Sequence, residues 1–296
     1  MNERIREIER AMEASAYVTD REVATAVFLA TTLQKPLLIE GHPGVGKTEI
    51  AKVLAHILQT DLIRLQCYEG LDAASALYEW NYPRQLLHLK LEEGGTSTHA
   101  ERERTLFSEA FLLKRPLLAA ITHPDRAPVL LIDEVDRADE EFEAFLLEVL
   151  SDFQVSIPEL GTIRATHRPV VVLTSNRSRD LSEALRRRCL YTWIGYPSFD
   201  KELRVVRARV PGLSERLARE LTAFLQALRT RRLEKTPGVA ESVDWGLALV
   251  ALHADHLDEG LVQATLGCVL KDERDLATVG ASLADGQLPA MLAIGG

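Results

Sequence analysis

The sequence predicts an α/β fold, in which a parallel five-stranded sheet flanked by helices is followed by a small all-helical domain. A glycine-rich motif follows the first strand-like run and opens a helix, as in nucleotide-binding α/β proteins. After Pro197 the chain shows only helical patterns, which predicts an α/β domain over 1–197 and a helical domain over 198–296. The five strands are expected where short apolar runs occur, at 37–40, 62–65, 129–132, 170–173 and 191–194.

Composition excludes several classes of protein. The 296 residues carry a net charge of −9, which argues against a general nucleic-acid binder. The three cysteines lie far apart without a C-x-x-C pair, so they predict buried free thiols rather than a zinc or redox motif. The charged N-terminus has no signal-like apolar region, and no apolar run approaches the ~20 residues that a membrane span needs. A cytoplasmic protein without a membrane span is therefore expected.

The segment 41–48 reads GHPGVGKT and matches the P-loop pattern G-x-x-x-x-G-K-[ST] at every required position. Its glycines permit the tight turns that point backbone N–H groups at phosphate oxygens. Lys47 is predicted to reach the β- and γ-phosphates of ATP, and the Thr48 hydroxyl to ligate Mg²⁺. The expected nucleotide-binding residues are Gly41, His42, Pro43, Gly44, Val45, Gly46, Lys47, Thr48, Glu49 and Asp133.

An apolar run over 129–132 ends in Asp133 and Glu134, the pattern of a Walker B motif. The carboxyl ends of parallel strands are where open α/β sheets place their chemistry. Asp133 is expected to hold Mg²⁺ through water, and Glu134 to act as general base on the attacking water. The alternative is a solvated acidic turn after a strand.

Two further sets of side chains are candidates for the same site. Asn176 follows the strand at 170–173 and is placed to touch the γ-phosphate or the attacking water, unless it is only a turn residue. Arg186, Arg187 and Arg188 end a short helix that begins at Ser182. They are either a solvated cationic helix end or an arginine finger for the site of an adjacent subunit.

Two segments between these motifs are distinctive. Residues 67–104 break the apolar pattern, which indicates either a long functional insertion or a poorly ordered loop, and helical spacing resumes over 107–113. Residues 153–165 carry Pro158 and Gly161 between two β-prone runs, which predicts a hairpin.

In this order the motifs resemble those of the AAA+ ATPases, and within them the MoxR family. They are GHPGVGKT at 41–48, LLIDEVDRA at 130–138, TSN at 174–176 and ALRRRC at 184–189. The stretches at 175–177 and 183–197 are similar to those of the CoxD subgroup. The resemblance covers residues ~20–285, on the scale of one AAA+ module.

The resemblance implies roles for single residues. Asn176 falls on sensor 1, and Arg187 and Arg188 fall where the family has its finger arginine. The segment at about 67–95 corresponds to an insertion in helix 2, and that at about 154–164 to the pre-sensor-1 hairpin; both face the pore or client in the family. The chain departs from the family at sensor 2, because the lid helix expected near Glu241 has no arginine.

MoxR proteins are ATP-hydrolysing chaperones that mature metalloenzymes. The resemblance therefore implies a homo-oligomeric ring, expected to be hexameric, a partner with a von Willebrand factor A domain and a client metalloenzyme. In the CoxD subgroup the client is carbon monoxide dehydrogenase with its molybdenum–copper centre. Two alternatives remain: a nucleic-acid motor, which the acidic insertion disfavours, and a nucleotide-switched binding module, which the presence of Glu134 and the finger arginines disfavours.

Overall fold

The computed structural model describes residues 3–92 and 98–293. Parallel pairings join β2 to β5, β5 to β8 and β8 to β1, and β9 completes the five-stranded sheet, which confirms the predicted fold class. In sheet order the strands are β2 (Leu62–Gln66), β5 (Val129–Asp133), β8 (Val170–Ser175), β1 (Leu37–Gly41) and β9 (Leu190–Ile194).

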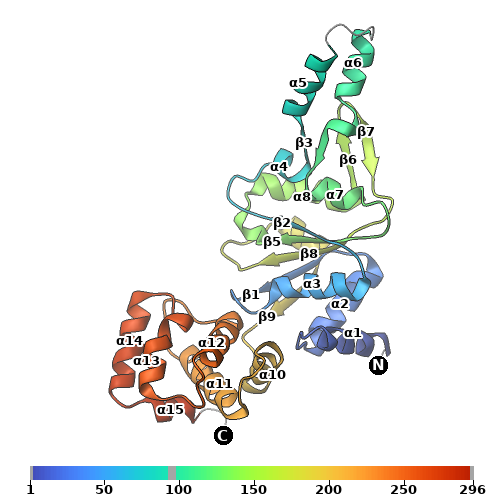
Figure 1. Cartoon of the computed structure of the whole chain (residues 1–296). Coiled ribbons are helices and arrows are strands. Elements are labelled where there is room, and N and C mark those ends of the chain that lie inside the picture. Colours follow the sequence, from blue (N-terminus) through green and yellow to red (C-terminus); the bar gives the residue numbers. More distant parts are fainter. Residues whose placement is uncertain (1–2, 93–97, 294–296) are drawn as a thin grey trace. The chain divides into compact units, whose positions relative to one another are not determined.

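The central strands are apolar because helices cover both faces of the sheet. Every residue of β1 and of β5 is buried. Figure 1 shows α4 (Ala73–Leu77), α7 (Pro116–Ile121) and α8 (Glu140–Asp152) on one face, and α2 (Arg21–Leu33) and α3 (Lys47–Leu58) on the other. Continuous apolar runs are what such doubly covered parallel strands require.

The described residues divide into two compact units. The core unit comprises residues 3–5, 21–40, 50–92 and 98–192, and the lid unit comprises 6–20, 41–49 and 193–293. The helix α1 (Glu3–Ala14) begins in the first and continues in the second. The P-loop segment 41–49 therefore groups with the C-terminal helices, whereas the Walker B carboxylates belong to the core unit.

The lid unit is helical from Phe199 onward and has its own apolar core around Trp245 and Phe224, which are both fully buried. The helices are α10 (Phe199–Arg209), α11 (Glu215–Arg229), α12 (Val239–Ala251), α13 (Glu259–Val269), α14 (Glu273–Ala284) and α15 (Leu288–Leu292).

The described part of segment 67–104 is folded. Its elements are α4, β3 (Tyr78–Trp80), α5 (Tyr82–Leu91) and α6 (His99–Leu106), and Trp80 joins the apolar core of the unit. The last residues of the predicted insertion, 93–95, lie outside the described residues. The prediction of a helix over 107–113 is wrong: a 3-10 turn, η1 (Glu109–Phe111), leads into β4 (Leu112–Lys114), because Leu112 pairs with Trp80 in an antiparallel ladder.

The predicted hairpin is confirmed as β6 (Gln154–Ile157) and β7 (Gly161–Arg164), paired antiparallel. Val155 and Ile157 are buried and Ser156 is exposed, the alternation of a half-covered strand. Among residues 3–92 and 98–293, no helix has the length and apolar character to cross a membrane. The same residues hold no cluster of three or more His, Cys, Asp or Glu side chains suited to a metal ion.

Candidate nucleotide site

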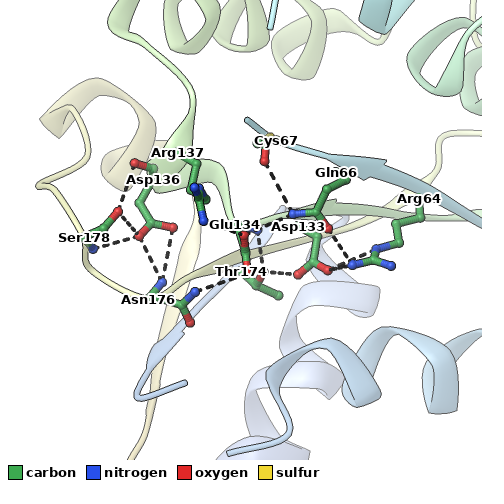
Figure 2. Close-up of polar contacts among 10 residues, drawn as sticks. All are labelled: Arg64, Gln66, Cys67, Asp133, Glu134, Asp136, Arg137, Thr174, Asn176 and Ser178. Carbon is green, nitrogen blue, oxygen red and sulfur yellow. Dashed lines mark hydrogen bonds and ion pairs between the residues drawn. The ribbon is translucent and has the colours of Figure 1, made fainter. Parts of the chain in front are cut away.

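The acidic half of the candidate site lies where β5 and β8 end, in the core unit. These strands are parallel neighbours, so their carboxyl ends meet at one edge of the sheet. Asp133 is the last residue of β5, Glu134 follows it, and Asn176 follows the end of β8. The structure thus brings together the three side chains that the sequence placed in two separate motifs (Figure 2).

Asp133 is buried and receives hydrogen bonds from the strands on both sides (Figure 2). From β2, the Nε and Nη2 of Arg64 donate to Asp133 Oδ2 at 3.0 and 2.5 Å. From β8, the Thr174 hydroxyl donates to Asp133 Oδ1 at 2.5 Å, and it accepts the backbone N–H of Glu134 at 2.9 Å. The carboxylate is therefore fixed in orientation by its neighbours.

Glu134 has a left-handed backbone, with φ of 55°, which is uncommon for a residue other than glycine. Its side chain is about one-third exposed. Gln66 Nε2 on β2 donates to Glu134 Oε2 at 3.2 Å, and Asn176 Nδ2 lies 3.5 Å from Oε1. A residue on β2 and the residue that follows β8 therefore orient this carboxylate, and strained backbone of this kind is typical of functional positions.

Asp136 fixes the loop that follows β8. It is buried and accepts the backbone N–H of Asn176 at 3.2 Å. It also accepts the backbone N–H of Ser178 at 2.8 Å and its hydroxyl at 2.7 Å. These bonds hold Asn176 beside Glu134, and Figure 2 shows Asp136 between Ser178 and Asn176, bonded to both.

Cys67 lies next to the carboxylates, and its backbone N–H donates to the Asp133 carbonyl at 2.9 Å. Burial first, and then the charges of Asp133, Asp136 and Glu134, together raise the pKa of its thiol to about 12. The thiol therefore stays protonated and is a poor nucleophile at neutral pH. Its role in the structure is that of a buried apolar side chain.

The P-loop belongs to the lid unit. Gly44 and Gly46 have φ of +73° and +91°, the left-handed values that a turn around an anion requires. Lys47 is buried, and its Nζ donates to the carbonyls of Gly41 and His42 at 2.8 Å each. Thr48 is the second residue of α3, so its amide lies in the first turn of that helix.

Two other side chains of the segment 41–49, His42 and Glu49, contact the rest of the lid unit. The His42 ring stacks on Tyr196, with 4.4 Å between ring centroids, and meets the edge of Trp193 at 5.5 Å. Glu49 Oε2 lies 3.5 Å from Arg209 Nη1. Val45 is buried, and Pro43 is exposed.

The chemistry of these groups fits a magnesium nucleotide. Left-handed glycine turns, a lysine and a helix N-terminus are suited to a polyphosphate. The Thr48 hydroxyl and the Asp133 carboxylate are the hard oxygen donors that Mg²⁺ prefers.

The three consecutive arginines of α9 (Glu183–Arg188) have different surroundings. Arg186 Nη2 donates to Glu40 Oε1 at 2.8 Å, and the Glu40 side chain is fully buried. Arg187 forms an exposed ion pair at 2.8 Å with Glu183, one helical turn away. Arg188 is exposed and has no ion-pair partner among the described residues. Arg186 is thus held inside its own chain, and Arg187 and Arg188 lie at the surface.

Sequence reasoning missed the residues that orient the two carboxylates. Arg64 and Gln66 lie two apart on edge strand β2, where alternating polar residues are ordinary. Thr174 was noted only as part of the TSN motif, and Asp136 only as part of LLIDEVDRA. The one signal for Asp136 is a third acid two residues after the Asp-Glu pair that ends a buried strand.

Comparison with known proteins identifies the family. A family model described as the AAA domain of the dynein-related subfamily matches residues 36–189, which is just over half of the chain. The chain belongs to this family of AAA+ ATPases. The matched span contains the P-loop, Asp133, Glu134, Asn176 and the α9 arginines.

Three relatives show how far the similarity extends. An uncharacterized protein of Staphylococcus epidermidis is 26% identical over 264 residues, covering 86% of this chain and 90% of that protein. Chaperone protein ClpB 2 of Parasynechococcus marenigrum is 32% identical over 142 residues, covering 47% of this chain but 13% of ClpB. The Holliday junction branch migration complex subunit RuvB of Thermotoga maritima is 25% identical over 250 residues, covering 81% of this chain and 61% of RuvB.

A solved structure of a variant of Thermotoga maritima RuvB matches this chain with a TM-score of 0.50 at 18% identity. The match covers 92% of this chain and 70% of that one. At this identity the likeness concerns the fold alone.

Proposed function

We propose that this chain hydrolyses ATP with Mg²⁺, using Glu134 as the general base. The observation that carries the proposal is the placement of Asp133 and Glu134 at the end of β5, with each carboxylate oriented by a side chain from β2 and by one from the end of β8 or the residue after it. A general base must lie within hydrogen-bond reach of the proton that it removes, and its pKa matters only once that geometry is met. Asn176 Nδ2 lies 3.5 Å from Glu134 Oε1, which supports a role for Asn176 in orienting the water that Glu134 would activate.

The remaining roles follow from the chemistry of each group. The P-loop amides and Lys47 bind the phosphates, and Thr48 and Asp133 hold Mg²⁺, which neutralises developing charge on the phosphoryl oxygens. The exposed Arg187 or Arg188 serves as a finger for an adjacent subunit, which requires an oligomeric ring, for which we propose six subunits. Functionally, residues 1–197 form the nucleotide-binding domain and 198–296 its lid.

Two substitutions separate binding from hydrolysis. Lys47→Ala should abolish both, because the lysine contacts the phosphates in the ground state and in the transition state. Glu134→Gln keeps the shape of the side chain and one acceptor oxygen but removes the base. It should bind ATP normally and lose turnover by about a hundredfold or more. Glu134→Gln turnover equal to that of the wild type would contradict the role of Glu134.

We further propose that hydrolysis remodels a client metalloenzyme, as in MoxR proteins of the CoxD type. The order of the motifs supports this role. The insertion offers a client surface, because α5 exposes apolar side chains that a monomeric protein would ordinarily bury. They are Tyr82, Leu86, Leu87, Leu89 and Leu91, with exposed fractions of 59%, 61%, 58%, 37% and 77%. A partner with a von Willebrand factor A domain belongs to the same proposal.

A nucleic-acid motor is the second candidate, favoured by the similarity to RuvB over 81% of this chain. Capture with the ATP-bound Glu134→Gln protein distinguishes the two roles. The chaperone role predicts that the trap retains a molybdenum-containing dehydrogenase and that a Leu86→Ser, Leu87→Ser variant of α5 releases it. Retention of a DNA duplex or junction at physiological salt, unaffected by the α5 substitutions, would favour the motor.

A further inference from the structure

The N-terminus of lid helix α12 is capped by the P-loop. The backbone N–H groups of Val239 and Ala240 donate to the Gly44 carbonyl at 2.9 and 3.0 Å. A helix begins with N–H groups that lack a partner within the helix, and a side chain at the N-cap position usually accepts one of them. Here the N-cap residue is Gly238, which has no side chain, and a carbonyl from the P-loop takes its place.

Gly238 allows this contact because it lacks a Cβ atom. A Cβ at this position would lie 2.7 Å from the Pro43 carbonyl oxygen and 2.9 Å from Gly44 Cα. Its φ of −86° is open to any residue, so the requirement for glycine comes from the P-loop and not from the backbone of α12. The same close approach appears from the other side, where a Cβ on Gly44 would lie 3.2 Å from Gly238 Cα.

Arg229 holds the turn before α12 in place. Its Nε donates to the Pro237 carbonyl at 2.8 Å, and its Nη2 donates to the Gly238 carbonyl at 3.1 Å. The guanidinium also forms a two-point ion pair with Glu202, at 2.5 and 2.7 Å, and both side chains are buried. Because an arginine fork has fixed geometry, this pair sets the position of the turn.

A second route leads from Arg229 to the P-loop. The guanidinium lies 5.1 Å from the centre of the Tyr196 ring, which stacks on His42. Arg229 therefore supports two of the lid groups that contact the P-loop, the turn at Gly238 and the Tyr196 ring. The lid helix itself carries no arginine between Val239 and Ala251.

We propose that Gly238 and Arg229 are positioning residues that couple the lid to nucleotide through main-chain contact with the P-loop, in place of an arginine side chain on α12. The inference rests on the proposed function, since it concerns the response to bound nucleotide. When the P-loop points its N–H groups toward phosphate, its carbonyl groups point outward. The Gly44 carbonyl then accepts the hydrogen bonds from the first N–H groups of α12. Coupling of this kind is reciprocal, so a change in α12 capping changes nucleotide affinity.

The sharpest test is Gly238→Ser. Serine is at least as favourable as glycine at an N-cap, so the substitution does not weaken the helix through capping, but its Cβ collides with the P-loop. We expect ADP affinity, measured with a fluorescent analogue, to fall by about tenfold, or 1.4 kcal/mol. The matched control is Gly267→Ser in α13, where a Cβ meets nothing within 4 Å. A Gly238→Ser protein that binds ADP as tightly as the control would overturn the coupling.

Amide hydrogen exchange tests the coupling without relying on that variant. In the wild type, ADP should slow exchange at Val239 and Ala240, and Arg229→Lys should speed exchange at the same two amides while those of α13 stay unchanged. Unchanged exchange at both amides on ADP binding would overturn the coupling, even if Gly238→Ser fails to fold. A wild type that binds no ADP would overturn the proposed function and the coupling with it, whereas normal binding with unchanged exchange removes the coupling alone.

Discussion

Arg64 forms a two-point contact with Asp133, in which Nε and Nη2 both donate to Oδ2, at 3.0 and 2.5 Å. The arginine is half-exposed on β2, and the aspartate is buried at the end of β5. The same Nη2 lies 2.5 Å from Gln66 Oε1, and Gln66 in turn contacts Glu134. One side chain thus connects the proposed magnesium ligand to the group that orients the proposed base.

Removing the Arg64 charge should make Mg²⁺ binding easier. The guanidinium and the cation are attracted to the same carboxylate, so Arg64→Met should lower the half-saturating Mg²⁺ concentration roughly threefold, the scale expected of a partly exposed ion pair. Arg64→Lys retains the charge and should stay closer to the wild type. Titrating Mg²⁺ against thermal stability at saturating ADP measures this without turnover. An equal or higher Mg²⁺ requirement in Arg64→Met would contradict the competition.

Gln66 should affect the rate more than the binding of ATP. Gln66→Leu preserves most of the side-chain volume but cannot donate to Glu134, so the carboxylate loses one of its orienting contacts. We expect kcat to fall by about tenfold with KM changed less than twofold, because the base is misplaced while the phosphate contacts remain. Steady-state kinetics at saturating Mg²⁺ give both constants. A change confined to KM would assign Gln66 to binding instead.

Substitutions of the three α9 arginines should differ in whether they lower stability or turnover. Arg186→Gln leaves the buried Glu40 carboxylate without its closest ion pair and should cost about 1–3 kcal/mol of stability. Arg187→Gln and Arg188→Gln, at exposed positions, should each change the free energy of unfolding by less than about 0.5 kcal/mol. The one that acts as the finger should lower turnover by roughly a thousandfold. Urea unfolding and ATPase assays on all three variants check this, and full turnover in both surface variants would exclude a finger in α9.

The buried pair between Glu202 and Arg229 should be far more costly to break than a surface pair. Arg229→Met leaves the fully buried Glu202 carboxylate without its countercharge, at a cost of about 3–5 kcal/mol. The control is Arg187→Met, which breaks an exposed ion pair with Glu183, one helical turn away. It should lower the free energy of unfolding by about 0.5 kcal/mol or less. Urea unfolding followed at Trp245, in the same apolar core, compares the two. Similar losses of stability in the two variants would contradict the higher cost of breaking the buried Glu202–Arg229 pair.

Alkaline pH should destabilise the fold through Cys67, whose thiol pKa is raised to about 12 by burial. Below the pKa of the unfolded thiol, both states are protonated and the stability is fully present. Above it the unfolded state loses its proton first, so stability falls as pH rises toward 12. Between pH 8 and 10 the wild type should lose about 1–2 kcal/mol more than Cys67→Ala does. Equal losses in both proteins would contradict this origin of the pH dependence.

The sheet could be predicted because local pattern decides it. Runs such as 129–132 and 170–173 are apolar on both faces, and the P-loop spacing is set by phosphate chemistry, so both are visible in the sequence. The placement of Asp133, Glu134 and Asn176 at the ends of neighbouring strands followed from the same patterns. Their catalytic roles stay predictions.

What the sequence did not show depends on contacts between distant segments. Arg64 and Gln66 face Asp133 and Glu134 because β2 lies beside β5 in the sheet. No local sequence pattern encodes which strands are neighbours. Residues 107–113 have helical spacing, but pairing with β3 draws Leu112 into a strand, so tertiary contact overrides local preference. The glycine at 238 looks like an ordinary turn until the P-loop is seen against it.

The central claim, ATP hydrolysis at a site shared between subunits, is tested most directly by mixing two inactive variants. Glu134→Gln supplies intact finger arginines, and an Arg187→Ala, Arg188→Ala variant supplies an intact base. If a finger acts in trans, an equimolar mixture should regain up to about a quarter of wild-type turnover, rising with protein concentration, because each productive site draws one group from each neighbour. A mixture as inactive as its components, with both variants assembled and binding ATP, would contradict the shared site.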